Sequence, residues 1–114
     1  MDKPDKPCVI WTSADPEVAM NMALMYAKNS RLKGWWGTVR LIVWGPSQKT
    51  LMADAALQKE LFECAQAGVE LWACRACADR YGLIQKLEGL GLDVLYVGDP
   101  LTRMLKDDWS VLTV

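Results

Sequence analysis

The sequence contains no histidine, and its 13 lysines and arginines nearly balance its 14 aspartates and glutamates, which gives a net charge of −1. The absence of histidine removes the commonest general base and every metal site that needs an imidazole ligand. The balanced charge argues against a nucleic-acid-binding surface, which needs a basic excess. It favours self-association, because little electrostatic repulsion keeps copies of the chain apart.

The sequence also lacks a recognisable secretory signal and a run long enough to span a membrane. Residues 1–7 are polar and contain two prolines, which predicts a short flexible lead-in. The longest apolar run, residues 18–27, is interrupted by Asn21 and is too short to cross a bilayer. We therefore expect a cytoplasmic protein whose four cysteines are thiols rather than a disulfide framework.

The composition is that of one globular domain. The chain has 114 residues, of which 52% are hydrophobic and 24% are charged. This length is close to the commonest size of a single domain. Because no low-complexity tract or linker interrupts the pattern, we expect one domain over residues 1–114.

Five short apolar runs alternate with segments of helical pattern. The runs predict buried strands at residues 8–11, 39–44, 69–73, 93–97 and 111–114. The intervening segments predict helices at residues 16–31, 48–67, 83–89 and 99–106, and a short helix that holds Cys77 and stops at Gly82. Since strict β–α alternation with buried strands is typical of α/β proteins, we expect a parallel sheet with helices on both faces.

Several helices carry recognisable start, stop and face signals. Asp15-Pro16 and Asp99-Pro100 each offer a capping carboxylate and a proline for the first helical turn. The helix at 48–67 is expected to stop at Gly68. Its buried face is expected to hold Leu57, Leu61, Cys64 and Ala65. The apolar residues of helix 16–31 cover more than one stripe, so part of this helix is expected to contact another subunit.

The loops that follow the strands are the candidate ligand-binding positions, because open parallel sheets bind ligands at the carboxyl ends of their strands. The polar and charged candidates in these loops are Ser13, Ser47, Lys49, Arg75 and Asp99. Helix starts near three of them, Ser13, Ser47 and Asp99, would favour an anionic ligand. The segment Gly45–Thr50 lacks the G-x-x-x-x-G-K-[S/T] spacing of a phosphate loop.

The four cysteines differ in their expected surroundings. Cys8 lies at the opposite edge of the sheet and Cys64 on the buried face of a helix, so both are expected to be small core residues. Cys74 and Cys77 form a C-x-x-C motif where the third strand meets a helix. The positive end of that helix, together with Arg75, would favour a thiolate and lower the pKa of a thiol placed there.

The C-x-x-C motif admits four interpretations. A zinc site as a rule needs four ligands, so two subunits would each have to contribute a pair, and we expect no metal within one chain. A thioredoxin-like dithiol fits the spacing, but that fold carries its motif after its first βα unit. A single reactive cysteine fits the location best, with the second thiol as a resolving partner or a structural neighbour. Two inert thiols at a helix start are the remaining interpretation.

The tryptophans are also placed regularly. Trp11, Trp44 and Trp72 each fall near the end of a predicted strand. They either form an apolar, partly water-excluded pocket around the cysteines or simply cap a small core. The pair Trp35-Trp36 lies in a loop bracketed by glycines and predicts either a lid packed on the core or a subunit contact.

The segment from Cys74 to Leu83, Cys-Arg-Ala-Cys-Ala-Asp-Arg-Tyr-Gly-Leu, resembles the cysteine segment of the DsrE/DsrF-like family. In that family a strand ends in cysteine, and an arginine- or tyrosine-glycine pair follows. The resemblance extends over nearly the whole chain in the succession of strands and helices. It implies a three-layer α/β/α sandwich of the Rossmann or flavodoxin-like kind, with five parallel strands in the order 4-3-2-1-5, and assembly into trimers or hexamers.

The resemblance also implies a function. In the sulfur-relay members, a cysteine eight residues before the glycine carries a persulfide, and counting back from Gly82 gives this role to Cys74. Cys77 would then be a supporting thiol. The chain would act as a sulfur carrier between donor and acceptor proteins, without a cofactor. The alternative is an oligomeric small-ligand-binding module of the same fold that does no covalent chemistry.

Overall fold

The computed structural model describes residues 5–114, so the first four residues of the predicted lead-in lie outside the described part of the chain. Five strands form one sheet: β1 (Pro7–Trp11), β2 (Arg40–Val43), β3 (Glu70–Cys74), β4 (Asp93–Leu95) and β5 (Ser110–Thr113). All neighbouring strands are parallel, in the order β4-β3-β2-β1-β5. The predicted parallel sheet is confirmed, as is the strand order that the resemblance implies. Pro7 already belongs to β1, so the lead-in ends earlier than predicted.

Helices fill every connection between successive strands. They are α1 (Pro16–Val18), the π-helical segment η1 (Ala19–Ala23), α2 (Leu24–Leu32), α3 (Ser47–Met52), α4 (Ala55–Ala67), α5 (Arg75–Tyr81), α6 (Ile84–Gly89) and α7 (Gly98–Lys106). The first three follow one another without a break and occupy the predicted helix 16–31. Each predicted helix therefore has a counterpart in the structure.

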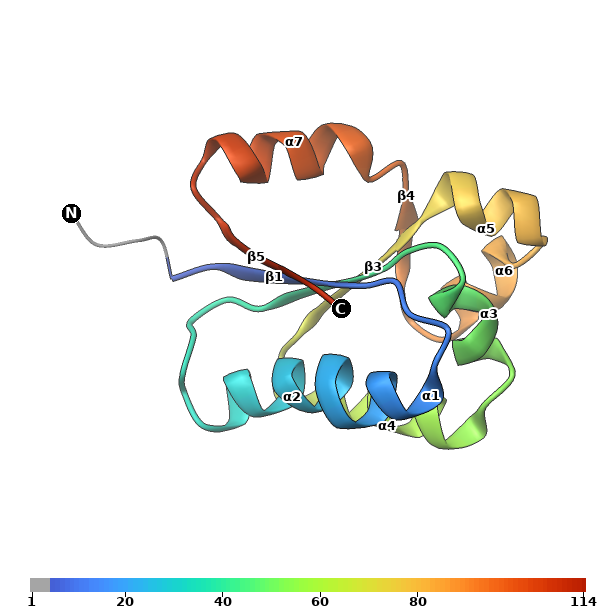
Figure 1. Cartoon of the computed structure of the whole chain (residues 1–114), viewed down its shortest axis with the longest axis horizontal. Coiled ribbons are helices and arrows are strands. Elements are labelled where there is room, and N and C mark those ends of the chain that lie inside the picture. Colours follow the sequence, from blue (N-terminus) through green and yellow to red (C-terminus); the bar gives the residue numbers. More distant parts are fainter. Residues whose placement is uncertain (1–4) are drawn as a thin grey trace.

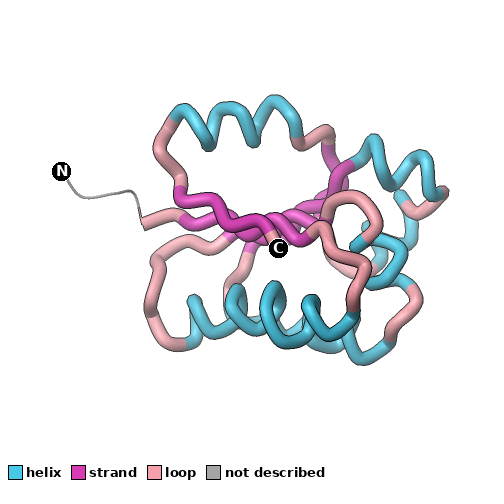
Figure 2. The backbone as a smooth tube through the Cα atoms, in the orientation of Figure 1, coloured by secondary structure: helices cyan, strands magenta, loops and turns pink. Residues whose placement is uncertain are grey.

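The strand order explains how the helices are divided between the two faces. The first three crossovers each move one strand along the sheet in the same direction, whereas the crossover from β4 returns to β5 beside β1. Because such crossovers are right-handed, α7 lies on the face opposite to the helices of the first three. Figure 1 shows α7 on one side of the sheet and α1, α2 and α4 on the other, and Figure 2 shows the same three layers. The three-layer α/β/α sandwich is confirmed.

The core consists of two clusters, one on each face of the sheet. The larger cluster joins strand residues such as Val9 and Leu41 to helix residues such as Leu24 and Leu61. The smaller cluster lies on the α7 face and holds Cys8, Ile10, Ile42, Cys74, Val97 and Met104. This division follows from the alternation of side chains along each strand. It places Cys74 on the face that α7 covers.

The predicted helix 48–67 is wrong in one respect, since a break separates α3 from α4. Asp54 has an extended backbone there, and its carboxylate accepts hydrogen bonds from the amides of Ala56 (2.9 Å) and Leu57 (3.2 Å). This N-cap satisfies two backbone amides in the first turn of α4, which have no carbonyl partner within that helix. On α4, Leu57, Leu61 and Cys64 are buried as expected, but Ala65 is exposed. Gly68 ends α4 in the left-handed conformation, with φ of 100°.

The two predicted aspartate caps have different outcomes. The Asp15 carboxylate accepts from the amide of Glu17 at 2.8 Å and caps α1, as predicted. Asp99 does not cap α7, because the helix already begins at Gly98, one residue earlier. Asp99 therefore lies inside the first turn, where its carboxylate pairs with the Arg103 guanidinium at 2.8 Å.

Candidate functional site

Cys74 is the last residue of β3 and the N-cap residue of α5. Its side chain is 4% exposed and packs in the cluster on the α7 face. The short helix that it opens ends at Gly82, which adopts the left-handed conformation with φ of 67°. The local structure around the C-x-x-C motif is therefore the strand–cysteine–helix turn that the sequence predicts.

The electrostatics of Cys74 differ from the expectation. Burial raises the pKa of the Cys74 thiol, and this contribution outweighs the hydrogen bonds from the amides of Cys77 and Ala76, which lower it. The expected lowering of the pKa by the helix start and Arg75 is therefore wrong. The thiol is the resting form at neutral pH, and the two amides lie ready to stabilise a negative charge on the sulfur when it forms.

Cys77 lies one helical turn beyond Cys74 and is half-buried. The Cys77 side chain beside it also raises the pKa of Cys74. Cys77 is the more accessible residue of the pair. All four cysteines of the chain are free thiols.

Of the two interpretations of the strand-end tryptophans, a pocket formed by all three around the cysteines is not observed. Trp11 is fully buried in the larger cluster, on the face opposite to Cys74, and its indole donates to the carbonyl of Ser13 at 3.0 Å. Trp72 shares a face with Cys74, but its ring stacks on the Arg40 guanidinium, 3.9 Å from the ring centroid. Trp44 is partly buried on the same face. Trp44 and Trp72 thus lie on the same face of the sheet as Cys74, but the Trp72 ring stacks on Arg40.

Gln48 was not assigned a role from the sequence; it lies in the first turn of α3, just after the carboxyl end of β2. Its side chain is fully buried, and its amide nitrogen donates to the carbonyls of Val43 (3.1 Å) and Cys74 (3.0 Å). The amide therefore joins the ends of β2 and β3 directly behind the cysteine. Only the sheet register brings these two carbonyls together, so no local sequence signal could have identified the contact.

The candidate binding residues after β1 and β2 are not gathered around one point. Ser47 is fully buried, and its hydroxyl lies 2.7 Å from the Trp11 carbonyl and 2.9 Å from the Trp44 carbonyl. It ties the ends of β1 and β2 together and is closed to a ligand. Ser13 is half-buried, and its hydroxyl oxygen accepts from the amide of Asp15 at 3.1 Å. Lys49 is exposed, with its ammonium 4.8 Å from the Tyr81 ring centroid.

The remaining candidates are also separate. Arg75 is half-buried at the start of α5, next to Cys74. Asp99 is exposed and paired with Arg103, as described above. The polar groups of Ser47 and Asp99 are therefore already engaged within the protein, whereas Cys74, Arg75 and Cys77 lie together where β3 meets α5.

Cys8 and Cys64 are core residues, as predicted. Both are fully buried, and burial raises the pKa of each thiol from 9.0 to about 12. The Cys64 thiol also donates to the carbonyl of Leu24 at 3.4 Å. These two sulfur atoms are closed to reagents in the folded protein.

Residues 5–114 provide neither a metal site nor a membrane-spanning helix. No group of three or more cysteine, aspartate or glutamate side chains in this range is placed to hold a metal ion. None of the helices in the same range has the length and apolar character needed to cross a membrane.

Comparisons with known proteins give a strong structural similarity. No protein-family model matches the sequence, and no curated protein matches it either. A solved structure that resembles the chain is that of BT1422, a conserved protein of unknown function from Bacteroides thetaiotaomicron. The two sequences are 36% identical, the match covers 96% of this chain and 95% of that chain, and the TM-score is 0.93.

Proposed function

We propose a function from the residues of the chain itself, because the chain belongs to the family of BT1422, a conserved protein of unknown function from Bacteroides thetaiotaomicron. The protein is a cytoplasmic sulfur carrier of the DsrE/DsrF-like kind, which holds sulfur as a persulfide on Cys74. The observation that carries this proposal is the position of Cys74 at the carboxyl end of β3 and at the start of α5, with Cys77 one helical turn further on.

The loading step transfers one sulfur atom without net oxidation. The Cys74 thiolate attacks the outer sulfur of a donor persulfide, the S–S bond of the donor breaks, and the donor leaves as a thiolate. The product is a Cys74 persulfide whose charge faces the amides of Ala76 and Cys77. Because burial keeps Cys74 protonated at rest, loading should accelerate as the pH rises through the raised pKa.

Cys77 offers a route for unloading. Its thiolate can attack the inner sulfur of the Cys74 persulfide, which forms the Cys74–Cys77 disulfide and expels hydrosulfide. In this step the two thiols are oxidised and the carried sulfur is reduced. Direct transfer to the thiolate of an acceptor protein leaves Cys77 unchanged. Donor and acceptor proteins are therefore the partners of the proposed carrier.

Self-assembly is part of the proposal, with the trimer or hexamer that the resemblance implies. It is supported by large apolar side chains that stay more than half exposed in the single chain, among them Leu32 (64%) and Leu105 (56%). A net charge of −1 adds little repulsion between copies. Light scattering on the purified protein measures the assembly: a mass of three or six chains supports it, and a monomer over the working concentration range contradicts it.

A second candidate, a binding module without covalent chemistry, is favoured by the burial and raised pKa of Cys74. Thiol titration separates the two functions. A carrier requires that Cys74 react with a small disulfide reagent in the folded state at mildly alkaline pH. A binding module is indicated when Cys74 reacts only after unfolding.

Intact-mass spectrometry after incubation with glutathione persulfide tests the carrier function. The Cys77→Ser variant is expected to gain one sulfur atom, whereas Cys74→Ser gains none. The wild type is expected to gain the same sulfur atom, or to lose two hydrogen atoms when Cys77 expels hydrosulfide and the disulfide forms. Cys64→Ala is the matched control, because Cys64 is fully buried and should not contribute. A Cys74→Ser variant that takes up as much sulfur as the wild type rules the proposal out.

A further inference from the structure

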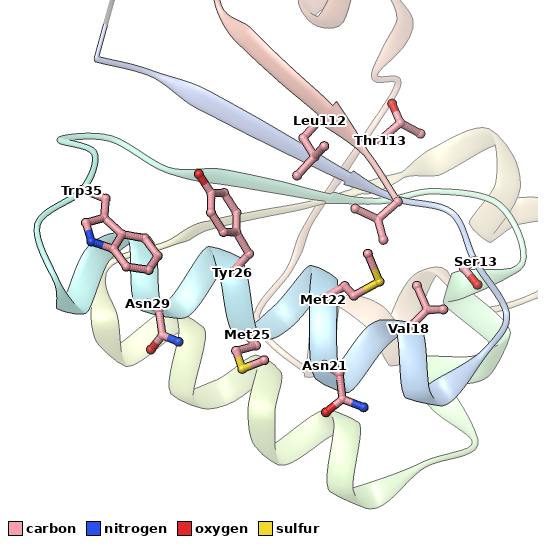
Figure 3. Close-up of a pocket in the computed structure, with 11 residues that line it drawn as sticks. Ser13, Val18, Asn21, Met22, Met25, Tyr26, Asn29, Trp35, Leu112 and Thr113 are labelled. Carbon is pink, nitrogen blue, oxygen red and sulfur yellow. The ribbon is translucent and has the colours of Figure 1, made fainter.

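An open groove of about 810 Å³ runs between the first helical run and the edge strand β5. Figure 3 shows Ser13 and Trp35 at opposite ends of the groove, with the side chains of η1 and α2 between them. From Val18 to Asn29 this wall is about 16 Å long, at 1.5 Å per helical residue. The volume lies within the range of roughly 300–1,000 Å³ that is usual for small-molecule sites.

The groove follows from the topology of the sheet. In the sheet register Leu112 of β5 pairs with Val9 of β1, so both side chains point to the same face. Val9 is fully buried beneath the first crossover helices, whereas Leu112 is 48% exposed. The difference arises because β5 lies beyond β1, on the side away from all three of the crossovers that cover this face. The edge of the sheet is therefore left open on this face.

The position of the groove is one at which open α/β sheets bind ligands. The chain leaves β1 toward β2, and β5 lies on the opposite side of β1, so the strand order reverses between β1 and β5. Ligands of such sheets bind in the crevice outside the carboxyl ends at this reversal. Ser13, which follows β1, and Val114, which follows β5, both line the groove. This location does not depend on the cysteine site, which lies on the other face at β3.

The wall opposite β5 includes an unusual helical segment. Met22 belongs to η1, the π-helical segment between α1 and α2, and is 55% exposed to the groove. π-Helical turns are rare and recur at functional sites. Met25 follows on α2 and is 42% exposed. Two flexible, polarisable methionine side chains can adapt to the shape of an apolar ligand.

The other end of the groove is aromatic. Tyr26 and Trp35 have ring centroids 6.0 Å apart, tilted by 33°. Trp36 packs on the core, and its indole donates to the Tyr26 hydroxyl at 3.0 Å, so the hydroxyl proton of Tyr26 is left to donate. The Ser13 hydroxyl accepts from Asp15 in the same way and keeps its own proton. Among the described residues that line the groove, none has a charged side chain.

We propose that this groove binds a neutral, largely apolar small molecule with an aromatic portion and at least one oxygen that can accept a hydrogen bond. The aromatic portion lies against Tyr26 and Trp35, the remainder lies against the methionines and Leu112, and the hydroxyls of Tyr26 and Ser13 donate to it. The groove lining has no cationic side chain and therefore selects against anions, because a sulfonate or carboxylate would lose its hydration without gaining a cation.

The test compares two fluorescent probes with the same aromatic rings. N-phenyl-1-naphthylamine is neutral, and 1-anilinonaphthalene-8-sulfonate carries a sulfonate. The wild type is expected to bind the neutral probe saturably, one per chain, and at least tenfold more tightly than the anionic probe. Equal or tighter binding of the anionic probe overturns the proposal, as does the absence of saturable binding of the neutral probe.

Lysine substitutions on the two walls of the groove test whether the neutral probe binds there. Met25→Lys and Leu112→Lys alter exposed side chains on the two walls and should each weaken the neutral probe at least tenfold. Phe62→Lys on α4 is the matched control, since its side chain is similarly exposed (59%) and does not line the groove. It should stay within twofold of the wild type. An equal loss in Phe62→Lys means general adsorption and overturns the proposal.

Light scattering at the same concentrations completes the test. The molecular mass of the assembly is expected to be the same for the wild type and Met25→Lys. A smaller mass for Met25→Lys means that a second copy of the chain covers the groove, and it overturns the small-molecule assignment.

Discussion

The replacement of Gln48 by alanine should cost about 4 kcal/mol of unfolding free energy, because the side chain is fully buried and bridges two strands. The change leaves the carbonyls of Val43 and Cys74 without the amide that now lies 3.1 and 3.0 Å from them. Each buried carbonyl that loses its donor costs about 1–3 kcal/mol. The side-chain oxygen of Gln48 has no donor within residues 5–114, so its removal returns about 1 kcal/mol. The cavity adds about 1–2 kcal/mol.

Gln58 provides the matched control. Its amide nitrogen also donates to two carbonyls, those of Leu51 (3.1 Å) and Met52 (3.3 Å), but its side chain is half-buried. Water can replace these hydrogen bonds, so Gln58→Ala should cost only about 1 kcal/mol. Urea unfolding followed by circular dichroism measures both values. Equal losses of unfolding free energy in the two variants, or a loss below about 1 kcal/mol for Gln48→Ala, would contradict the role assigned to the buried Gln48 amide.

Two further predictions concern buried thiols and helix capping. Because folding raises the pKa of Cys8 and of Cys64 from 9.0 to about 12, their contribution to stability is complete below about pH 9. Between about pH 9 and 12 each thiol should lose about 1.4 kcal/mol per pH unit. Urea unfolding at several alkaline pH values should show this slope, and the Cys8→Ala/Cys64→Ala variant should lack most of it; equal slopes contradict the assignment. Asp54→Ala removes the cap of α4 and should cost about 1 kcal/mol in the same assay, whereas an unchanged midpoint would show that the cap contributes nothing.

The fold could be predicted because its determinants are local. Buried apolar runs, the capping carboxylate of Asp15 and the left-handed stops at Gly68 and Gly82 each act within a few residues. A capping signal gives the wrong prediction where the helix begins one residue earlier than the signal indicates. Asp99-Pro100 resembles Asp15-Pro16, yet α7 begins at Gly98 and draws Asp99 into its first turn.

The candidate site was harder to predict, because its properties depend on register and on distant packing. Trp11 and Trp44 both lie at strand ends, but Trp11 is aligned with Val43, so Trp44 lies one residue further along and on the other face. The pKa of Cys74 is set by burial among residues of other elements, such as Val97 and Met104. The groove beside β5 arises from the position of that strand at the edge and has no local signature.

The central claim is that Cys74, rather than Cys77, carries the sulfur. Peptide mapping by mass spectrometry tests it most directly, after the folded wild type is treated with glutathione persulfide and the remaining thiols are alkylated. Fragmentation then assigns the added sulfur atom to one of the two cysteines. We expect the added sulfur on Cys74. The yield of the Cys74 persulfide should rise with pH, because burial raises the pKa of this thiol. Added sulfur on Cys77, with Cys74 recovered as a simple alkylated thiol, would contradict it.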